Sequence, residues 1–213
     1  MSPTQFDLSA VPMDASRWQT GLTLAAFVEK MTAYQDEMRR RLREVALADA
    51  DCAELARLNR PVHALVMTED WCPDSLMNVP ILARVVEVAP EMDMRIFLRS
   101  RSPDLETYYQ ARDVRCIPVF TFLDAAFNEI GTWLERPQAA HERLQAWKAE
   151  HPEFDPTHHD PTLSRREHGA RRRALLQGLP LEMERWYAEG LQAETVKELK
   201  ALLAGHGLRG LHG

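Results

Sequence analysis

The sequence is poor in cysteine: Cys52, Cys72 and Cys116 are the only ones among 213 residues. An odd and sparse count argues against a disulfide framework. In a reducing compartment, isolated cysteines are more often buried hydrophobic residues, metal ligands or reactive thiols. The role of each cysteine therefore has to be judged from its own surroundings.

Long apolar runs and an excess of basic residues are also missing. No stretch has the roughly 18 consecutive apolar residues of a membrane-spanning helix, and the amino terminus lacks the basic start and apolar core of a secretory signal. Acidic residues outnumber basic ones, 32 to 26, which gives a net charge of -6. Such a balance repels nucleic acid and anionic membranes at long range. We therefore expect a cytoplasmic protein that binds neither nucleic acid nor membranes.

The composition is that of an ordinary globular protein, with 45% hydrophobic and 27% charged residues. Changes in periodicity divide the chain into three predicted segments. Residues 1–60 form an amino-terminal arm followed by helices, and residues 61–150 alternate strands with helices. Residues 151–213 comprise a proline-broken linker and a helical extension.

The first segment is predicted to be helical. Apolar residues recur every three or four positions from Leu24 to Val45, which predicts one long amphipathic helix over 23–45 with Thr23 as its N-cap. A shorter helix is predicted over 48–58, with Cys52 on its apolar face as a core residue. We expect these helices to pack on the central segment.

The central segment predicts an α/β fold. Nearly continuous apolar runs indicate buried strands, and amphipathic stretches indicate helices between them. The predicted strands are 62–68, 94–98, 119–123 and 129–134, and the predicted helices are 73–88, 104–110 and 137–150. This βαβαββα order requires one crossover between parallel strands and allows a final hairpin, so the central sheet is expected to be mixed.

The last segment starts with a polar linker over 151–161. Its histidines, His151, His158 and His159, lie near acidic residues, but the surrounding prolines favour a solvated linker over a metal site. No metal is therefore predicted. Helices are expected over 163–176, 179–188 and 193–204, followed by a frayed tail.

The stretch from Glu69 to Ser75 (Glu-Asp-Trp-Cys-Pro-Asp-Ser) carries the clearest chemistry, because it places Cys72 between a strand and a helix. Unpaired amide groups and the helix dipole at a helix N-terminus favour a thiolate, which makes the sulfur more nucleophilic. Ser75, one turn along, is placed to donate a hydrogen bond to that sulfur. The carboxylate of Asp74 has the opposite effect, so the net direction of the thiol pKa shift stays open.

A second landmark lies at Ile117 and Pro118, just before a strand-like run. Proline is permitted at the first position of a strand, and a cis bond there would expose the main chain of Ile117. An exposed edge of this kind can pair with an extended peptide. Cys116 precedes this landmark and is a candidate resolving thiol.

At these two landmarks the sequence resembles the thioredoxin superfamily, whose Trp-Cys-x-x-Cys motif follows the central strand and whose cis-proline opens a later one. Trp71, Cys72 and Pro118 match that pattern, and the predicted element order agrees. More narrowly, the motif resembles a bacterial branch that carries Trp-Cys-x-Asp-Ser. The resemblance implies a thioredoxin-like fold with helical extensions at both ends, in which Trp71, Pro73, Asp74, Ile117 and Pro118 line the substrate site.

The sequence departs from the family pattern at two positions. Ser75 replaces the second motif cysteine, so Cys72 cannot close a dithiol cycle by itself, and Val66 replaces the buried acid of thioredoxins. A mixed disulfide at Cys72 would have to be resolved by an external thiol or by Cys116.

The leading hypothesis is a monothiol thiol-disulfide oxidoreductase in which Cys72 and Ser75 are catalytic. Its expected substrates are a disulfide-bearing protein or a small thiol. No cofactor is expected beyond a low-molecular-weight thiol, such as glutathione, as cosubstrate. The alternatives are a non-catalytic interaction or dimerisation module, which includes a possible homodimer, and a thiol-dependent transferase. The thiol pKa of Cys72 separates the first two hypotheses.

Overall fold

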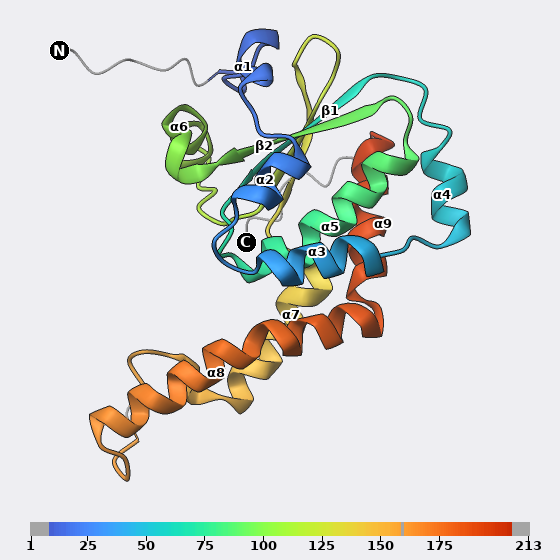
Figure 1. Cartoon of the computed structure of the whole chain (residues 1–213). Coiled ribbons are helices and arrows are strands. Elements are labelled where there is room, and N and C mark those ends of the chain that lie inside the picture. Colours follow the sequence, from blue (N-terminus) through green and yellow to red (C-terminus); the bar gives the residue numbers. More distant parts are fainter. Residues whose placement is uncertain (1–8, 159, 206–213) are drawn as a thin grey trace, which may run out of the picture. The chain divides into compact units, whose positions relative to one another are not determined.

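The computed structural model describes residues 9–158 and 160–205 (Figure 1). It contains two compact units. The first, which we call the sheet unit, comprises the residues up to Glu135 together with those from Thr195 onward. The second, the helical unit, comprises Arg136–Glu194. Each unit is described by itself.

The sheet unit contains every strand in the described part of the chain and most of its helices. Its strands are β1 (Val62–Thr68), β2 (Met92–Leu98), β3 (Val119–Leu123) and β4 (Glu129–Leu134). Its helices are α1 (Ala15–Gln19), α2 (Leu24–Lys30), α3 (Gln35–Glu44), α4 (Asp49–Leu55), α5 (Pro73–Val88), η1 (Arg99–Arg101) and α6 (Pro103–Gln110). Most of helix α9 (Gln192–Leu203) also belongs to this unit.

The strands form one four-stranded mixed sheet in the order β2-β1-β3-β4. Strand β1 pairs in parallel with β2 and antiparallel with β3, so that Val66 lies between Ile96 and Phe120. Strands β3 and β4 form the antiparallel hairpin. The predicted mixed α/β fold and its βαβαββα order are confirmed, because the four predicted strands pair into a single sheet.

One face of the sheet is covered by an aromatic-rich core. Leu65, Met67, Val119 and Leu123 project from the strands into it. They pack against residues of α1, α6 and the nearby loops, namely Val11, Trp18, Leu105, Tyr108, Tyr109 and Ile117. The buried side chains of α6 explain why that helix forms here, since its apolar positions face the sheet. Cys72 belongs to this same cluster.

Helices α5 and α9 cover the opposite face (Figure 1). The side chain of Leu202 on α9 packs against the backbone of Gly131 on β4, where a Cβ atom would lie 2.9 Å from it. Fully buried Asn78 links the two helices by accepting a hydrogen bond from the Thr195 hydroxyl at 3.0 Å. The C-terminal segment thus contributes directly to the core of the sheet unit.

The single helix predicted over 23–45 is wrong. Thr23 does cap α2, but that helix ends at Lys30, and α3 starts at Gln35. The backbone leaves the helical conformation between the two helices, and Tyr34 takes a left-handed conformation with φ of 53°. Periodicity alone continues across this break, because the apolar positions of the two helices face the same core.

Pro80 lies inside α5, where it cannot donate the usual backbone hydrogen bond to Leu76. Arg41 of α3 replaces that donor. Its buried guanidinium donates to the carbonyl oxygens of Leu76 at 3.0 Å and Met77 at 3.2 Å. The hydrogen bond that Pro80 removes from this helix is therefore replaced by one from a side chain of another helix.

The helical unit contains α7 (Gln138–Glu150), η2 (Pro152–Phe154), α8 (Arg165–Trp186) and η3 (Tyr187–Leu191). Trp147 lies at the centre of its aromatic contacts: its ring stacks on His151 and packs edge-to-face against Trp186. Ser164 and Glu167 form a capping box at the start of α8. The two helices predicted over 163–176 and 179–188 are one helix, which continues through Gly178 and Pro180.

No group of three or more histidine, cysteine or acidic side chains is placed to hold a metal ion within the described residues; His159 lies outside them. No helix within the same residues combines the length and apolarity needed to cross a membrane.

Candidate functional site

Cys72 is the N-cap residue of α5, directly beyond the carboxyl end of β1. Pro73 occupies the first helical turn, where its missing N–H costs nothing. The carbonyl oxygen of Cys72 accepts a hydrogen bond from the Leu76 amide at 3.1 Å, so the helix starts at this residue. The sulfur therefore lies beside the first unpaired amide groups of a 16-residue helix.

The two sequence landmarks meet at this point. The Sγ atom of Cys72 donates a hydrogen bond to the carbonyl oxygen of Ile117 at 3.3 Å, across 45 positions of sequence. The peptide bond between Ile117 and Pro118 is cis. Pro118 in turn accepts a hydrogen bond from the Glu135 amide at 2.8 Å, which holds the start of β3 beside the end of β4.

Cys72 is much less accessible than its position at a strand end suggested, with 5% of its surface exposed. This burial raises the pKa of its thiol above the ordinary value. Hydrogen bonds from the Ser75 hydroxyl and from the Ser75 and Asp74 amides lower the pKa, while the Asp74 carboxylate raises it. The expected effects of Ser75 and Asp74 on the thiol pKa are thus both present. Desolvation outweighs the hydrogen bonds that stabilise the thiolate, so the pKa is raised.

Ser75 is 1% exposed and shares a short hydrogen bond with the hydroxyl of Thr68 at the end of β1. Its hydroxyl is therefore held between the strand and the Cys72 sulfur. This fixed position makes Ser75 a hydrogen-bonding partner of Cys72 and leaves little room for it to contact a substrate.

Trp71 is the most exposed part of the motif, with 52% of its surface accessible. The guanidinium of Arg99 lies over its ring, 5.8 Å from the ring centre. Glu69 is buried, and its carboxylate accepts a hydrogen bond from the Ser100 amide at 2.6 Å. These contacts join the η1 turn to the Cys72 motif. The sequence did not predict this connection, because Arg99 and Ser100 belong to no recognisable motif.

The loop between α2 and α3 also reaches the site. The carboxylate of Asp70 accepts hydrogen bonds from the Thr32 amide at 2.7 Å, the Thr32 hydroxyl at 3.0 Å and the Ala33 amide at 3.2 Å. Burial opposes the charge on Asp70, but these bonds prevail and lower its pKa. Tyr34 follows, and its pKa is raised by burial, by Glu37 and by the nearby charge of a Cys72 thiolate.

The remaining cysteines differ in their placement. Cys116 is partly buried and packs against the core cluster that contains Cys72. It borders a crevice of about 10 Å³ shared with Arg99 and Arg115. Cys52 lies on α4 and is partly buried. None of the three cysteines is part of a disulfide.

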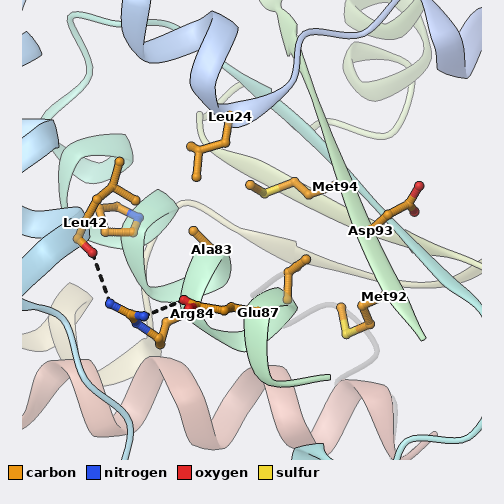
Figure 2. Close-up of a pocket in the computed structure, with 10 residues that line it drawn as sticks. Leu24, Leu42, Ala83, Arg84, Glu87, Met92, Asp93 and Met94 are labelled. Atoms are coloured by element: carbon orange, nitrogen blue, oxygen red, sulfur yellow. Dashed lines mark hydrogen bonds and ion pairs between the residues drawn. The ribbon is translucent and has the colours of Figure 1, made fainter. Parts of the chain in front are cut away.

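A pocket of the sheet unit lies away from these residues. It has a volume of about 510 Å³ and is lined by side chains of α2, α3, α5 and β2, among them Leu24, Leu42, Ala83, Arg84, Met92 and Met94 (Figure 2). Arg84 spans one side, donating to the carbonyl oxygen of Leu42 at 3.2 Å and pairing with Glu87. Because the pocket adjoins the start of β2, it lies toward the end of the sheet opposite Cys72.

A mixed sheet whose first strand delivers a cysteine to a helix N-terminus, beside the proline that opens a later strand, defines a protein with a thioredoxin-like fold. The sequence model of the family described as thioredoxin matches residues 21–148. The chain therefore belongs to the thioredoxin family.

Solved structures agree with this fold. A protein of unknown function from Pseudomonas aeruginosa is 22% identical, with a TM-score of 0.62, and the match covers 91% of this chain and 99% of that one. An HIV epitope scaffold is 21% identical, with a TM-score of 0.58, covering 88% and 95%. No curated protein matches. At these identities the similarity extends to the fold and not to an activity.

Proposed function

We propose that the protein is a monothiol thiol-disulfide oxidoreductase in which Cys72 forms mixed disulfides that an external thiol resolves. The observation that carries the proposal is the position of the Cys72 sulfur at the N-terminus of α5, 3.3 Å from the main chain of Ile117. A thiol placed there has both amide groups that stabilise a thiolate and an adjacent strand edge that can hold a peptide.

The reaction would proceed by two exchanges. The Cys72 thiol first loses its proton to solvent, and the thiolate attacks one sulfur of a disulfide. A bond forms from Cys72 to that sulfur, the original S–S bond breaks, and the other sulfur leaves as a thiolate that solvent protonates. In the second exchange, the thiolate of a low-molecular-weight thiol such as glutathione attacks the substrate sulfur of the mixed disulfide. A bond forms between those two sulfurs, the bond to Cys72 breaks, and Cys72 leaves as a thiolate. Such a thiol is abundant in the cytoplasm, where we place the protein.

Ser75 and Asp74 set how readily Cys72 enters this cycle. The Ser75 hydroxyl and the adjacent amides support the thiolate, whereas burial and Asp74 oppose it. Because the pKa of the thiol is raised, the thiolate population is small at neutral pH and the first exchange is slow. A high-pKa thiol is also a poor leaving group, so a mixed disulfide at Cys72 should be long-lived.

A non-catalytic binding module is the second candidate. The 5% exposure of Cys72 and its raised thiol pKa favour this alternative, because a buried, protonated thiol is typically inert. In that case the exposed ring of Trp71 and the strand opening at Ile117 would serve for recognition alone.

Mixed-disulfide capture separates the two candidates. The variant Cys52→Ser/Cys116→Ser, which retains only Cys72, is incubated with hydroxyethyl disulfide at pH 8 to 9 and its intact mass is followed over time. The proposal predicts a single adduct that glutathione removes, and no adduct when Cys72→Ser is added to the variant. If the native protein forms no adduct until denaturant is added, the binding module is the better account.

A further inference from the structure

We propose that the surface around Trp71 docks an acidic segment of a disulfide-bearing protein, with Arg99, Arg101 and Arg115 supplying the positive charge. This inference rests on the proposed function, because it names the substrate class of the same site.

The three arginines keep their charges available. Within residues 9–158 and 160–205, none of them forms an ion pair with a carboxylate. Some other arginines of the sheet unit are paired, as Arg17 is with Asp104 and Arg84 with Glu87. The whole chain has a net charge of -6, so these three positive side chains near the Cys72 motif differ in sign from the chain as a whole.

Fixed contacts hold Arg99 next to the motif. One guanidinium nitrogen, Nη1, donates to the carbonyl oxygen of Arg115 at 3.2 Å, while the guanidinium plane lies over the Trp71 ring. Arg115 is two residues before Ile117, whose carbonyl oxygen contacts the Cys72 sulfur. Arg99 thus lies beside Trp71 and Arg115 borders the same crevice, while Arg101 lies in the same η1 turn as Arg99.

The nearby acids do not cancel this charge at the surface. Glu69 and Asp74 are each 7% exposed, and Glu69 is held by the Ser100 amide. The carboxylate of Asp70 is bound by the loop at Thr32 and Ala33. Glu106 lines the same crevice as Arg99 and Arg115, is partly exposed and accepts a hydrogen bond from the Gln110 side chain at 3.1 Å. An approaching ligand therefore meets the guanidinium groups and the Trp71 ring together with this one acid, which the arginines outnumber.

The small volume of the crevice in this surface favours a protein segment over a small molecule as the ligand. The crevice between Arg99, Arg115 and Cys116 has a volume of about 10 Å³, which is room for about one water molecule. Ligand pockets for small molecules are typically about 300 to 1,000 Å³. Carboxylates carried on an extended chain could reach the separate arginines while its disulfide meets Cys72, and guanidinium groups are well suited to bind carboxylates.

The test measures mixed-disulfide formation with three peptides. Each contains one cysteine flanked by glutamates, glutamines or lysines, and is activated as its 2-thiopyridyl disulfide, whose leaving group is uncharged and absorbs light. Each rate is divided by the rate of the same peptide with 2-mercaptoethanol, which removes differences in intrinsic reactivity. The protein carries Cys52→Ser and Cys116→Ser, so that Cys72 is the reacting thiol.

The docking proposal predicts that the acidic peptide reacts faster than the neutral one by about tenfold at low ionic strength, and that the basic peptide is slowest. Salt should reduce the difference. Arg115→Gln and Arg101→Gln should each lower the acidic-to-neutral ratio, whereas Arg57→Gln, which removes an equal charge before the start of β1, should not. Equal rates for all three peptides, or a ratio unchanged in the arginine variants, would overturn the docking proposal and leave the exchange reaction standing.

A second measurement keeps the two proposals apart. Binding of labelled peptides with serine in place of cysteine is followed by fluorescence anisotropy with the Cys72→Ser variant, in which no disulfide can form at the site. Charge-dependent binding in this assay, together with no mixed disulfide from the activated peptides and the Cys72-containing protein, supports docking while contradicting the exchange activity. Binding that ignores peptide charge contradicts docking, whatever the thiol does.

Discussion

The sulfur of Cys72 donates a hydrogen bond to the carbonyl oxygen of Ile117 at 3.3 Å. This bond requires the protonated thiol, because a thiolate has no hydrogen to donate and would face the negative end of the carbonyl dipole. The site therefore holds Cys72 as a thiol at rest, in addition to the effect of burial. Deprotonation requires this contact to be given up.

The first prediction concerns the pH dependence of alkylation. In the variant Cys52→Ser/Cys116→Ser, the rate of reaction of Cys72 with iodoacetamide should rise with pH through a midpoint above the usual thiol value of about 8.5. The reason is that burial raises the pKa of this thiol. A midpoint at or below the usual value, measured on the folded protein, would show that the helix N-terminus prevails over desolvation.

Ser75→Cys should convert the site to a dithiol. The new thiol would replace a hydroxyl already held beside Cys72, so it should resolve the mixed disulfide within the molecule. We expect dithiothreitol-driven reduction of insulin to become measurable, with the wild type as the baseline and Ser75→Ala as the matched control. Correctly folded Ser75→Cys protein with no gain over Ser75→Ala would count against a competent exchange site.

Asp70→Asn should loosen the loop that carries Tyr34. Losing a charged acceptor of three hydrogen bonds should lower the free energy of unfolding at pH 7 by about 1 kcal/mol. Because the pKa of Asp70 is lowered by folding, this stabilisation is present above the unfolded value of about 3.9 and is lost as pH falls through the folded value.

Urea unfolding of wild type and Asp70→Asn at pH 7 and at about pH 3 checks this prediction. The difference between the two proteins should shrink at the lower pH. Asp36→Asn provides the control, because Asp36 is 94% exposed on α3 and accepts no comparable set of amides. A difference that stays constant with pH would show that the Asp70 charge is not what holds the loop.

Arg41→Met tests the compensation for Pro80. Removing the guanidinium leaves the carbonyl oxygens of Leu76 and Met77 without their buried donor, which should cost about 2 kcal/mol of unfolding free energy. In a Pro80→Ala background the new backbone N–H can serve Leu76, so the cost of Arg41→Met should fall. A double-mutant cycle by urea denaturation measures the coupling between Arg41→Met and Pro80→Ala. Purely additive losses of unfolding free energy would contradict the proposed compensation.

Local sequence signals predicted most of the sheet unit. Strand β1, helix α5 and strands β3 and β4 have the predicted bounds, because each is an apolar run limited by proline, polar or turn residues. The break at residues 31–34 could not be predicted this way. It depends on Asp70, which lies 37 to 38 positions further along the chain and binds the loop amides only after folding.

The position of Cys72 at the start of a helix could be predicted from the sequence, but its burial could not. The motif placed Cys72 at a helix start, and the fold brings it to Ile117. Its burial arises from long-range packing of Val11, Trp18 and Tyr108 on the same face of the sheet. No pattern around residue 72 contains that information, so the direction of the thiol pKa shift required coordinates.

The most direct test of the central claim is turnover. Substoichiometric protein is added to glutathione and hydroxyethyl disulfide, and oxidised glutathione is followed through a coupled reductase. We predict an initial rate above that of the uncatalysed exchange, increasing with pH, retained in Cys52→Ser/Cys116→Ser and abolished in Cys72→Ser. A rate for the wild type equal to that of Cys72→Ser across the same pH range would contradict the exchange function.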